Sequence, residues 1–323
     1  MKAAVIHTFG EAPRYEEFPE PEVLPGEELV SMRAVGVHQL VRALARGSHY
    51  GSDGTLPMVP GVDGVGITAE GRRVYCGLLR APFGTLAERA ATRVRIPVPD
   101  GMSDARCAAI VNPGLSGWLA LVVRAELEPG ETVLVLGATG ASGSLAVQIA
   151  KRLGAGRVIA AGRDVATLER LLGAGADAVV RLDGLDVAGA IAEAAGTGGI
   201  QVIVDYVWGV STEAALTAVT ARGFGRTTNR VRLVQVGETA ASTVQLPAAA
   251  LRSTDLVIMG SGLGAVALPA IGAQLPAFFA MAPELELDIL ELPLSDVQAA
   301  WNLETRSRLV LTMGRAPVTE VTL

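Results

Sequence analysis

The chain is poor in the residues that build disulfide, metal-cluster and nucleic-acid-binding proteins. Its 323 residues include only two cysteines, Cys76 and Cys107, too few for a disulfide framework or a structural zinc cluster. It has no block of lysine or arginine, and 27 basic against 33 acidic residues give a formal charge of −6. These absences argue against nucleic acid as a partner and are typical of a cytoplasmic protein in a reducing compartment.

Further absences concern the membrane and the substrate. The first residues lack the charged region and long apolar segment of a secretion signal, and Met1–Ile6 is better interpreted as a strand. The segment Leu256–Ala282 has no charge, but its four glycines and two prolines favour a strand, a loop and a short helix over a membrane span. We expect a buried strand followed by a subunit contact. Aromatic residues make up 4%, which does not favour a pocket that stacks large rings.

The most informative stretch is a strand that leads through glycines into a helix. Thr132–Leu136 is apolar throughout, as in a parallel strand buried on both faces. An apolar stripe then repeats every four residues from Leu145, as in a helix. The glycines follow Ala138-x-Gly140-x-x-Gly143 rather than the usual three-glycine pattern. The stretch predicts a pyrophosphate site, although a tight strand-to-helix connection explains the turn alone. The phosphate candidates are Thr139, Gly140, Ala141, Ser142 and Gly143.

The residues after the next strand indicate which cofactor binds. Arg157–Ala161 reads as a second strand, and it ends where a ribose-binding carboxylate commonly lies in such units. The chain has Gly162 and Arg163 there. An arginine pairs with a 2′-phosphate, which a carboxylate would repel, so the pattern favours NADPH. Asp164 is better explained as the cap of the following helix than as a ribose contact.

The pattern of elements predicts two domains and an α/β fold. Six short apolar strands, most of them separated by helical stretches, predict a doubly wound parallel sheet over residues 123–262. Residues 1–122 have short strands, many prolines and turns, which indicate a largely antiparallel β domain, and residues 263–323 return to that style. The nucleotide-binding domain is therefore expected as an insertion in a discontinuous first domain.

Several motifs occur in the same order along most of the chain. They are Met1–Val5, Pro60–Gly66, Gly84–Glu88, Ser116–Leu121 and Gly140–Gly154. Together they resemble the medium-chain dehydrogenase/reductase superfamily, in its zinc-independent quinone oxidoreductase-like branch. The resemblance implies a β-rich GroES-like catalytic domain beside a Rossmann domain, with nicotinamide in the cleft between them, and commonly a dimer or tetramer; we expect a homodimer.

The positions that bind zinc in the zinc-dependent relatives are poorly matched. Those relatives have a cysteine after the early Gly-Val and a Gly-His-Glu after the later proline, where this chain has His38 and Val62-Asp63. The region after Cys107 offers only Asn112 as a third ligand, in a segment, Asn112-Pro113-Gly114, that we interpret as a turn before a linking helix. We therefore expect no bound metal.

Without zinc, the substrate must be electron-poor or be polarised by a hydrogen-bond donor. The leading hypothesis is an NADPH-dependent reductase of quinones or α,β-unsaturated carbonyl compounds. Two alternatives are a carbonyl or alcohol dehydrogenase of the same superfamily and a non-catalytic NADPH-binding sensor or scaffold. Tyr50 is the first candidate donor, because similar reductases carry a tyrosine in this loop. The remaining candidates are His49, His38 and Asn112 for catalysis, and Gly237, Ser261 and Gly262 near the nicotinamide.

Overall fold

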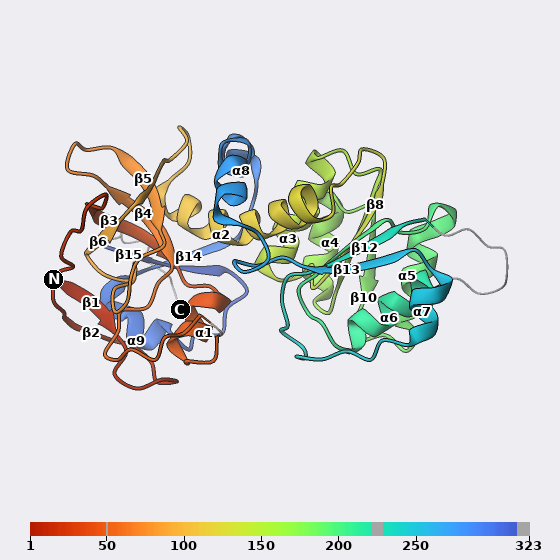
Figure 1. Ribbon diagram of the computed structural model, residues 1–323, viewed down its shortest axis with the longest axis horizontal. Helices are drawn as coiled ribbons and strands as arrows, with labels where there is room; N and C mark the ends of the chain where they lie inside the picture. The colour runs from red at the N-terminus through yellow and green to blue at the C-terminus, as the bar shows by residue number, and fades with distance from the viewer. Residues whose placement is uncertain (50, 221–228, 315–323) are drawn as a thin grey trace. The chain divides into compact units, whose positions relative to one another are not determined.

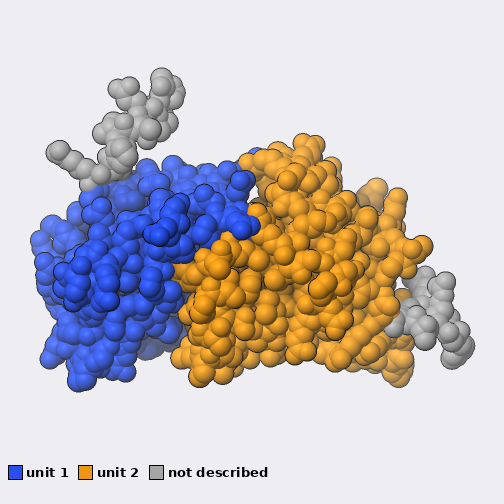
Figure 2. Space-filling view, turned by 90° about the horizontal axis from the view of Figure 1, so that it is seen from above, with its two compact units in different colours: residues 1–112, 282–323 blue, residues 113–281 orange. Residues whose placement is uncertain are grey.

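The computed structural model describes residues 1–49, 51–220 and 229–314, which form two compact units (Figures 1 and 2). Unit 1 comprises Met1–Asn112 and Ala282–Leu323, and unit 2 comprises Pro113–Met281. Tyr50, the first candidate donor, lies outside the described residues. Each unit has a sheet of its own.

Unit 2 is built on six parallel strands in the order β10-β9-β8-β11-β12-β13. With β8 counted as strand 1, this is the 3-2-1-4-5-6 order of a Rossmann fold, in which the order of the strands reverses beside β8. Its interior consists of Val, Leu, Ile and Ala side chains, because a parallel sheet covered on both faces has no solvent side. The strands are β8 (Thr132–Leu136), β9 (Arg157–Gly162), β10 (Ala178–Arg181), β11 (Val202–Asp205), β12 (Val231–Gln235) and β13 (Leu256–Gly260).

Helices connect most of these strands. Their sequences carry the expected local signals: Gly154, just after α3, has a φ of +89°, and the Asp164 side chain accepts from Thr167 N at 2.9 Å at the start of α4. The uncharged segment after β12 forms β13, a loop and α8, as its glycines and prolines predict. The helices are α3 (Ala141–Arg152), α4 (Val165–Gly173), α5 (Val187–Ala195), α6 (Val210–Val219), α7 (Ala248–Ser253) and α8 (Leu268–Met281).

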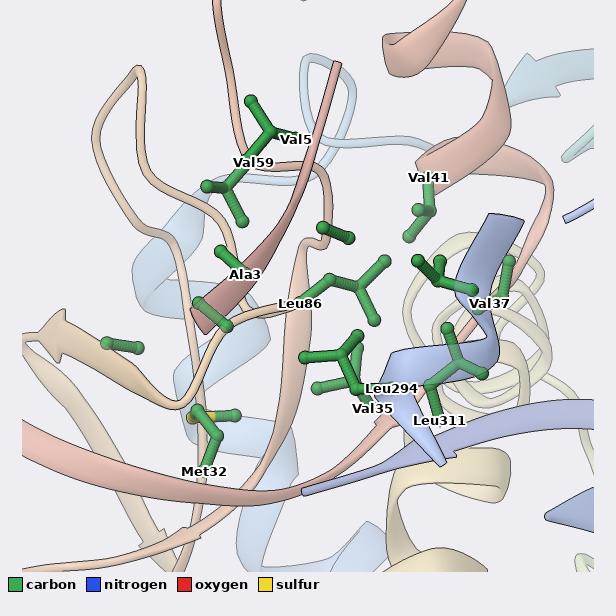
Figure 3. Packing of buried hydrophobic residues seen from close by; sticks show 14 of the residues in the cluster. Ala3, Val5, Met32, Val35, Val37, Val41, Val59, Leu86, Leu294 and Leu311 are labelled. Carbon is green, nitrogen blue, oxygen red and sulfur yellow. The ribbon is translucent and has the colours of Figure 1, made fainter. Parts of the chain in front are cut away.

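Unit 1 is the β-rich part of the chain. A seven-stranded, mostly antiparallel sheet runs in the order β14-β15-β3-β4-β5-β7, with β6 paired to β3 and with β1 and β2 forming a separate pair. Figure 3 shows its core, where Val35, Leu86 and Leu311 pack together from distant parts of the sequence. The elements are β1 (Lys2–Val5), β2 (Arg14–Glu17), β3 (Glu28–Gly36), α1 (Gln39–Ala45), β4 (Asp63–Ile67), β5 (Arg73–Gly77), β6 (Arg89–Thr92), β7 (Val94–Pro97), β14 (Ile289–Pro293), α9 (Val297–Ala300) and β15 (Arg308–Thr312).

The limits of the units differ from the boundaries expected at residues 122 and 263. α8 belongs to unit 2 because its Phe278 packs on the Trp118 ring, with centroids 6.0 Å apart, and Gln274 Oε1 accepts from Trp118 Nε1 at 3.1 Å. Trp118 ends α2 (Asp104–Trp118), the helix in which the chain leaves unit 1. The local glycine and proline patterns that predicted the boundaries give no information about this tertiary contact.

The interpretation of Asn112-Pro113-Gly114 as a turn is wrong. All three residues lie inside α2, with Pro113 as an internal proline, and the chain continues as a π-helix over Leu119–Arg124. Gly114 is needed for packing, because a Cβ atom there would lie 3.0 Å from the Phe278 ring. Burial of this apolar helix therefore outweighs the local preference for a turn.

Among the described residues, one helix is long and apolar enough to cross a membrane, over Asp104–Arg124. Two thirds of its most apolar window, 67%, is buried inside the protein, as in an ordinary core helix.

Candidate functional site

The glycine turn after β8 has a shape that its sequence explains. Gly137 has a φ of +81°, which bends the chain directly after the strand. A Cβ atom on Gly143 would lie 2.7 Å from Ala138 Cα and closer still to the Gly137 carbonyl oxygen. Only glycine therefore lets α3 approach the turn this closely. Gly137 and Gly143 thus permit the tight turn and the close helix packing for which the usual pattern also uses glycines. Ala138 is fully buried beneath the turn.

The start of α3 offers backbone N–H groups to an anion. Gly140 is the N-cap and has no side chain, so no side-chain hydrogen bond caps the helix. The first amides of a helix have no partner within it, and the helix dipole favours a negative group there. Thr139 and Ser142 are half-buried beside these amides. The five phosphate candidates thus surround one helix N-terminus, as a pyrophosphate site requires.

The end of β9 lies against this turn. A Cβ atom on Gly162 would lie 2.9 Å from Thr139 Oγ1, and the amides of Gly137 and Ala138 both donate to the Ala161 carbonyl oxygen at 2.9 Å. Arg163 follows directly and is exposed. The cofactor candidates of β8 and β9 are therefore neighbours in space.

The remaining cofactor candidates follow β12 and β13 at the same edge of the sheet. Gly237 N donates to Asp205 O at 3.1 Å, and a Cβ atom on Gly237 would lie 2.8 Å from Tyr206 O, so glycine permits this close approach. Ser261 N donates to Gln235 O at 2.8 Å, and Gly262 follows in an exposed loop. All three lie at strand C-termini, where ligands of such sheets bind.

A buried carboxylate organises the loop after β11. Asp205 is fully buried and accepts hydrogen bonds from Val207 N at 2.9 Å, Trp208 N at 3.0 Å and Thr212 Oγ1 at 2.5 Å. Burial raises its pKa, although these donors oppose that change. The bonds hold Trp208 at a φ of +61°, which is uncommon for a residue other than glycine. Asp205 therefore fixes the backbone of the loop that follows β11 at this edge of the sheet.

In unit 1, His38 belongs to a buried polar network. Its Nε2 lies 3.2 Å from Asp63 Oδ1, and both side chains are about 5% exposed. The Tyr75 hydroxyl donates to the other carboxylate oxygen, Oδ2. Burial, followed by the negative charge of Asp63, raises the pKa of Tyr75 well above its usual value. Sequence reasoning named His38 as a candidate donor and Asp63 only as a position that binds zinc in relatives, and it missed Tyr75; the signal for the pair was a carboxylate at the start of an otherwise apolar strand, β4.

Cationic and thiol groups lie around this network. Arg308 Nη1 donates to Val37 O at 3.2 Å, and burial lowers the pKa of Arg308 to about 10, against the opposing effect of Asp63. Cys76 and Cys107 are free thiols, and burial raises the pKa of each to about 12, with a smaller contribution from the Asp63 charge. Both are therefore neutral at ordinary pH.

The other catalytic candidates have different surroundings in unit 1. His49 is half-buried in a turn, where its Nδ1 accepts from Gly51 N at 3.0 Å. Asn112 is half-buried in α2. His38, in contrast, is paired with a carboxylate on β4. Of these three candidates, His38 is therefore the one that the structure places in a buried ionisable network.

The donor set of unit 1 does not fit a catalytic zinc ion. His38 already hydrogen-bonds to Asp63 through Nε2, the Val62 side chain has no ligand atom, and the third position holds Asn112, which is not among the Cys, His, Asp and Glu side chains that zinc prefers. No group of three or more His, Cys, Asp or Glu side chains able to hold a metal occurs among the described residues.

Comparison with known proteins agrees with this geometry. A family model described as zinc-binding dehydrogenase matches residues 141–275. "Probable NADPH-dependent quinone reductase tdiC" of Emericella nidulans is 29% identical, over 94% of this chain and 97% of that protein. The crystal structure of the quinone oxidoreductase from Thermus thermophilus superposes with a TM-score of 0.80 at 29% identity, covering 97% of this chain and all of that one.

By these matches the chain is similar, over nearly its whole length, to quinone oxidoreductase-like proteins of the medium-chain dehydrogenase/reductase superfamily. It is accordingly an oxidoreductase, and the expected two-part α/β fold is confirmed. A shorter match, 28% identical over 50% of this chain and 46% of that protein, is to the NADPH-dependent alkenal/one oxidoreductase of Arabidopsis thaliana chloroplasts.

Proposed function

We propose that this oxidoreductase uses NADPH to reduce quinones or α,β-unsaturated carbonyl compounds, without zinc. The uncapped N-terminus of α3 beside the glycine turn, with Arg163 at the end of the neighbouring strand, carries the proposal. The names of the relatives support the same reaction class, since two are described as NADPH-dependent reductases or oxidoreductases of quinones and alkenals or alkenones.

The residues of unit 2 fit the cofactor. Thr139–Gly143 would hold the pyrophosphate through backbone amides and the helix dipole, and Gly162 with Arg163 would hold the adenosine ribose and its 2′-phosphate. Gly237 and Ser261–Gly262 would lie towards the nicotinamide end, where missing side chains leave room. When bound, the cofactor supplies hydride to the electron-poor acceptor.

His38 is our first choice for the group that donates a hydrogen bond or proton to the acceptor oxygen. Asp63 pairs with one of its ring nitrogens, which fixes the orientation of the ring. The Tyr75 hydroxyl holds the carboxylate in turn. His49, Asn112 and Tyr50 are retained as further proposed contacts of the substrate.

The reaction proceeds without a metal in this proposal, because the zinc positions have no suitable ligands. Polarisation of the acceptor then depends on hydrogen-bond donors, which restricts the substrates to compounds that accept hydride readily. A carbonyl or alcohol dehydrogenase, the main alternative, would require stronger activation of an ordinary ketone or aldehyde.

We further propose a homodimer in the cytoplasm. β13 is at the end of the strand order, and its residues are only half-buried. The segment that follows it has no charged residue up to Pro283, and Leu263 and Leu268 are 50% and 55% exposed. An uncharged sheet edge with exposed leucines is suited to burial against a second copy. Measurement of the molar mass in solution tests this assembly.

The testing experiment compares NADPH with NADH by fluorescence titration and then follows cofactor oxidation with a small quinone, an enone and an aldehyde. We expect preference for NADPH and turnover of the quinone or enone. Arg163→Ala should weaken NADPH about ten- to a hundredfold, as for one lost charged hydrogen bond, with NADH little changed. Aldehyde turnover alone would favour the dehydrogenase, and tight binding without any turnover would favour the sensor.

A further inference from the structure

Two arginines lie at the adenosine end of the proposed cofactor site: Arg163 directly after β9 and Arg181 at the end of β10. β9 and β10 are adjacent parallel strands, and Arg181 is paired in register with Gly162. Leu182 N donates to Gly162 O at 2.8 Å, so the pairing continues to the last residue of β9. Arg163, one residue beyond Gly162, and Arg181 therefore lie at the same edge of the sheet, at the ends of two strands that are about 4.8 Å apart.

This edge adjoins the turn that would hold the pyrophosphate. Gly162 packs against Thr139, since a Cβ atom at Gly162 would lie within 2.9 Å of the threonine hydroxyl. The ribose of an adenine nucleotide is joined to that pyrophosphate, and its 2′ position must therefore lie near the ends of β9 and β10. Arg163 directly follows β9 and Arg181 is the last residue of β10, so both residues lie at this end of the sheet.

A carboxylate, Asp183, is paired with one of these arginines. Arg181 Nε donates to Asp183 Oδ1 at 3.0 Å and Arg181 Nη2 donates to Oδ2 at 2.9 Å, the two-point geometry of a guanidinium with an oxyanion. Asp183 also experiences the positive charge of Arg163, which helps to lower its pKa, after the larger effect of Arg181. The Arg181 and Asp183 side chains are 60% and 44% exposed, and such exposed pairs are weak and easily exchanged.

We propose that Arg181 is a second ligand of the 2′-phosphate and that Asp183 is an internal anion which the phosphate displaces. This inference rests on the proposed NADPH function and specifies which residues set the preference for the phosphorylated cofactor. The 2′-phosphate carries about two negative charges, against one on Asp183, so two arginines prefer it. Without the phosphate, Asp183 keeps Arg181 paired and offers no favourable contact to NADH.

The proposal makes opposite predictions for the two members of the ion pair. Arg181→Ala should raise the Kd of NADPH about tenfold and leave that of NADH within about twofold, because only NADPH has the phosphate. Asp183→Asn keeps the shape but removes the competing charge, and should lower the Kd of NADPH about three- to tenfold. A gain in affinity has the further advantage that misfolding cannot produce it.

The test measures the Kd of NADPH, NADH and adenosine 2′,5′-bisphosphate for the full-length protein and these variants. Arg152→Ala is the matched control: it removes one arginine of the same unit, eleven residues or about 16 Å along α3 from Ala141, and should change no Kd more than about twofold. Circular dichroism and thermal unfolding check that each variant is folded, and Arg181→Lys should recover part of the affinity.

Equal effects of Arg181→Ala on NADPH and NADH, or no effect on either, would overturn the proposal, as would an unchanged or weakened NADPH affinity in Asp183→Asn. These results differ from failure of the proposed function, in which the unmodified protein itself would show no preference for NADPH.

Discussion

Substitution of one glycine tests whether the turn after β8 holds a pyrophosphate. Gly143→Ala adds a Cβ atom 2.7 Å from Ala138 Cα, whereas ordinary contact begins at about 3.4 Å. α3 must therefore move away from the turn by at least about 0.7 Å, since the Gly137 carbonyl oxygen would lie closer still. The atoms it meets belong to the backbone, so a side-chain rotation cannot relieve the contact.

The size of the effect differs for stability and for binding. Overpacking of this kind costs about 1–3 kcal/mol, but replacing glycine by alanine inside a helix returns up to about 1 kcal/mol. We expect a net loss of stability of about 0–2 kcal/mol. A shift of about 0.7 Å is enough to break a phosphate hydrogen bond near 2.9 Å, at about 1.5–3 kcal/mol each. The affinity for the cofactor should therefore fall about ten- to a hundredfold.

Gly173→Ala is the matched control, because Gly173 is a helical glycine of α4 outside the proposed site, and a Cβ atom there would have no described atom within 4 Å. The assay is fluorescence titration of NADPH and NADH, beside urea denaturation. Gly143→Ala should weaken the binding of both cofactors alike, because both contain the pyrophosphate, and Gly173→Ala should change each Kd less than about threefold. Equal effects of the two substitutions, or selective loss of NADPH in Gly143→Ala, would refute the reasoning.

Three other predictions concern stability. Tyr75→Phe removes the donor to a buried carboxylate and should cost about 1.5–3 kcal/mol in urea denaturation, whereas Tyr15→Phe, at an exposed tyrosine, should stay within about 0.5 kcal/mol; similar losses would contradict the network. Because folding raises the pKa of Cys76 and Cys107 to about 12, their contribution is complete below about pH 9 and is lost as the pH rises towards 12. The urea midpoint should fall over that range, and a thiol reagent at pH 8 should label both only on unfolding; rapid native labelling would show that they are not buried. Asp205→Ala removes three accepted hydrogen bonds and should cost about 2–4 kcal/mol, and a thermal midpoint like that of the unmodified protein would disprove it.

The parallel sheet could be predicted from the sequence because each of its strands is a short apolar run. β8 has the predicted limits, and β9 is one residue longer than predicted. The N-cap at Asp164 could also be predicted, because an N-cap side chain accepts a hydrogen bond from a backbone amide only two or three residues away. Signals of this range are contained in a single segment.

The network around His38 could not be found in this way. His38 and Asp63 are 25 residues apart, and Tyr75 reaches the same carboxylate only through the antiparallel pairing of β4 with β5. The turn predicted at Asn112 failed for the same reason, because burial of α2 is decided by residues such as Phe278, far along the chain. Sequence position thus identified the candidate donor, and tertiary pairing determined what surrounds it.

The central claim is hydride transfer from NADPH to an electron-poor acceptor without a metal. The most direct measurement is the rate of NADPH oxidation with a small quinone by the full-length protein after exhaustive dialysis against a chelator, with and without added zinc. The account predicts full activity in the metal-free protein and no increase with zinc. Activity that disappears on dialysis and returns with zinc would contradict it.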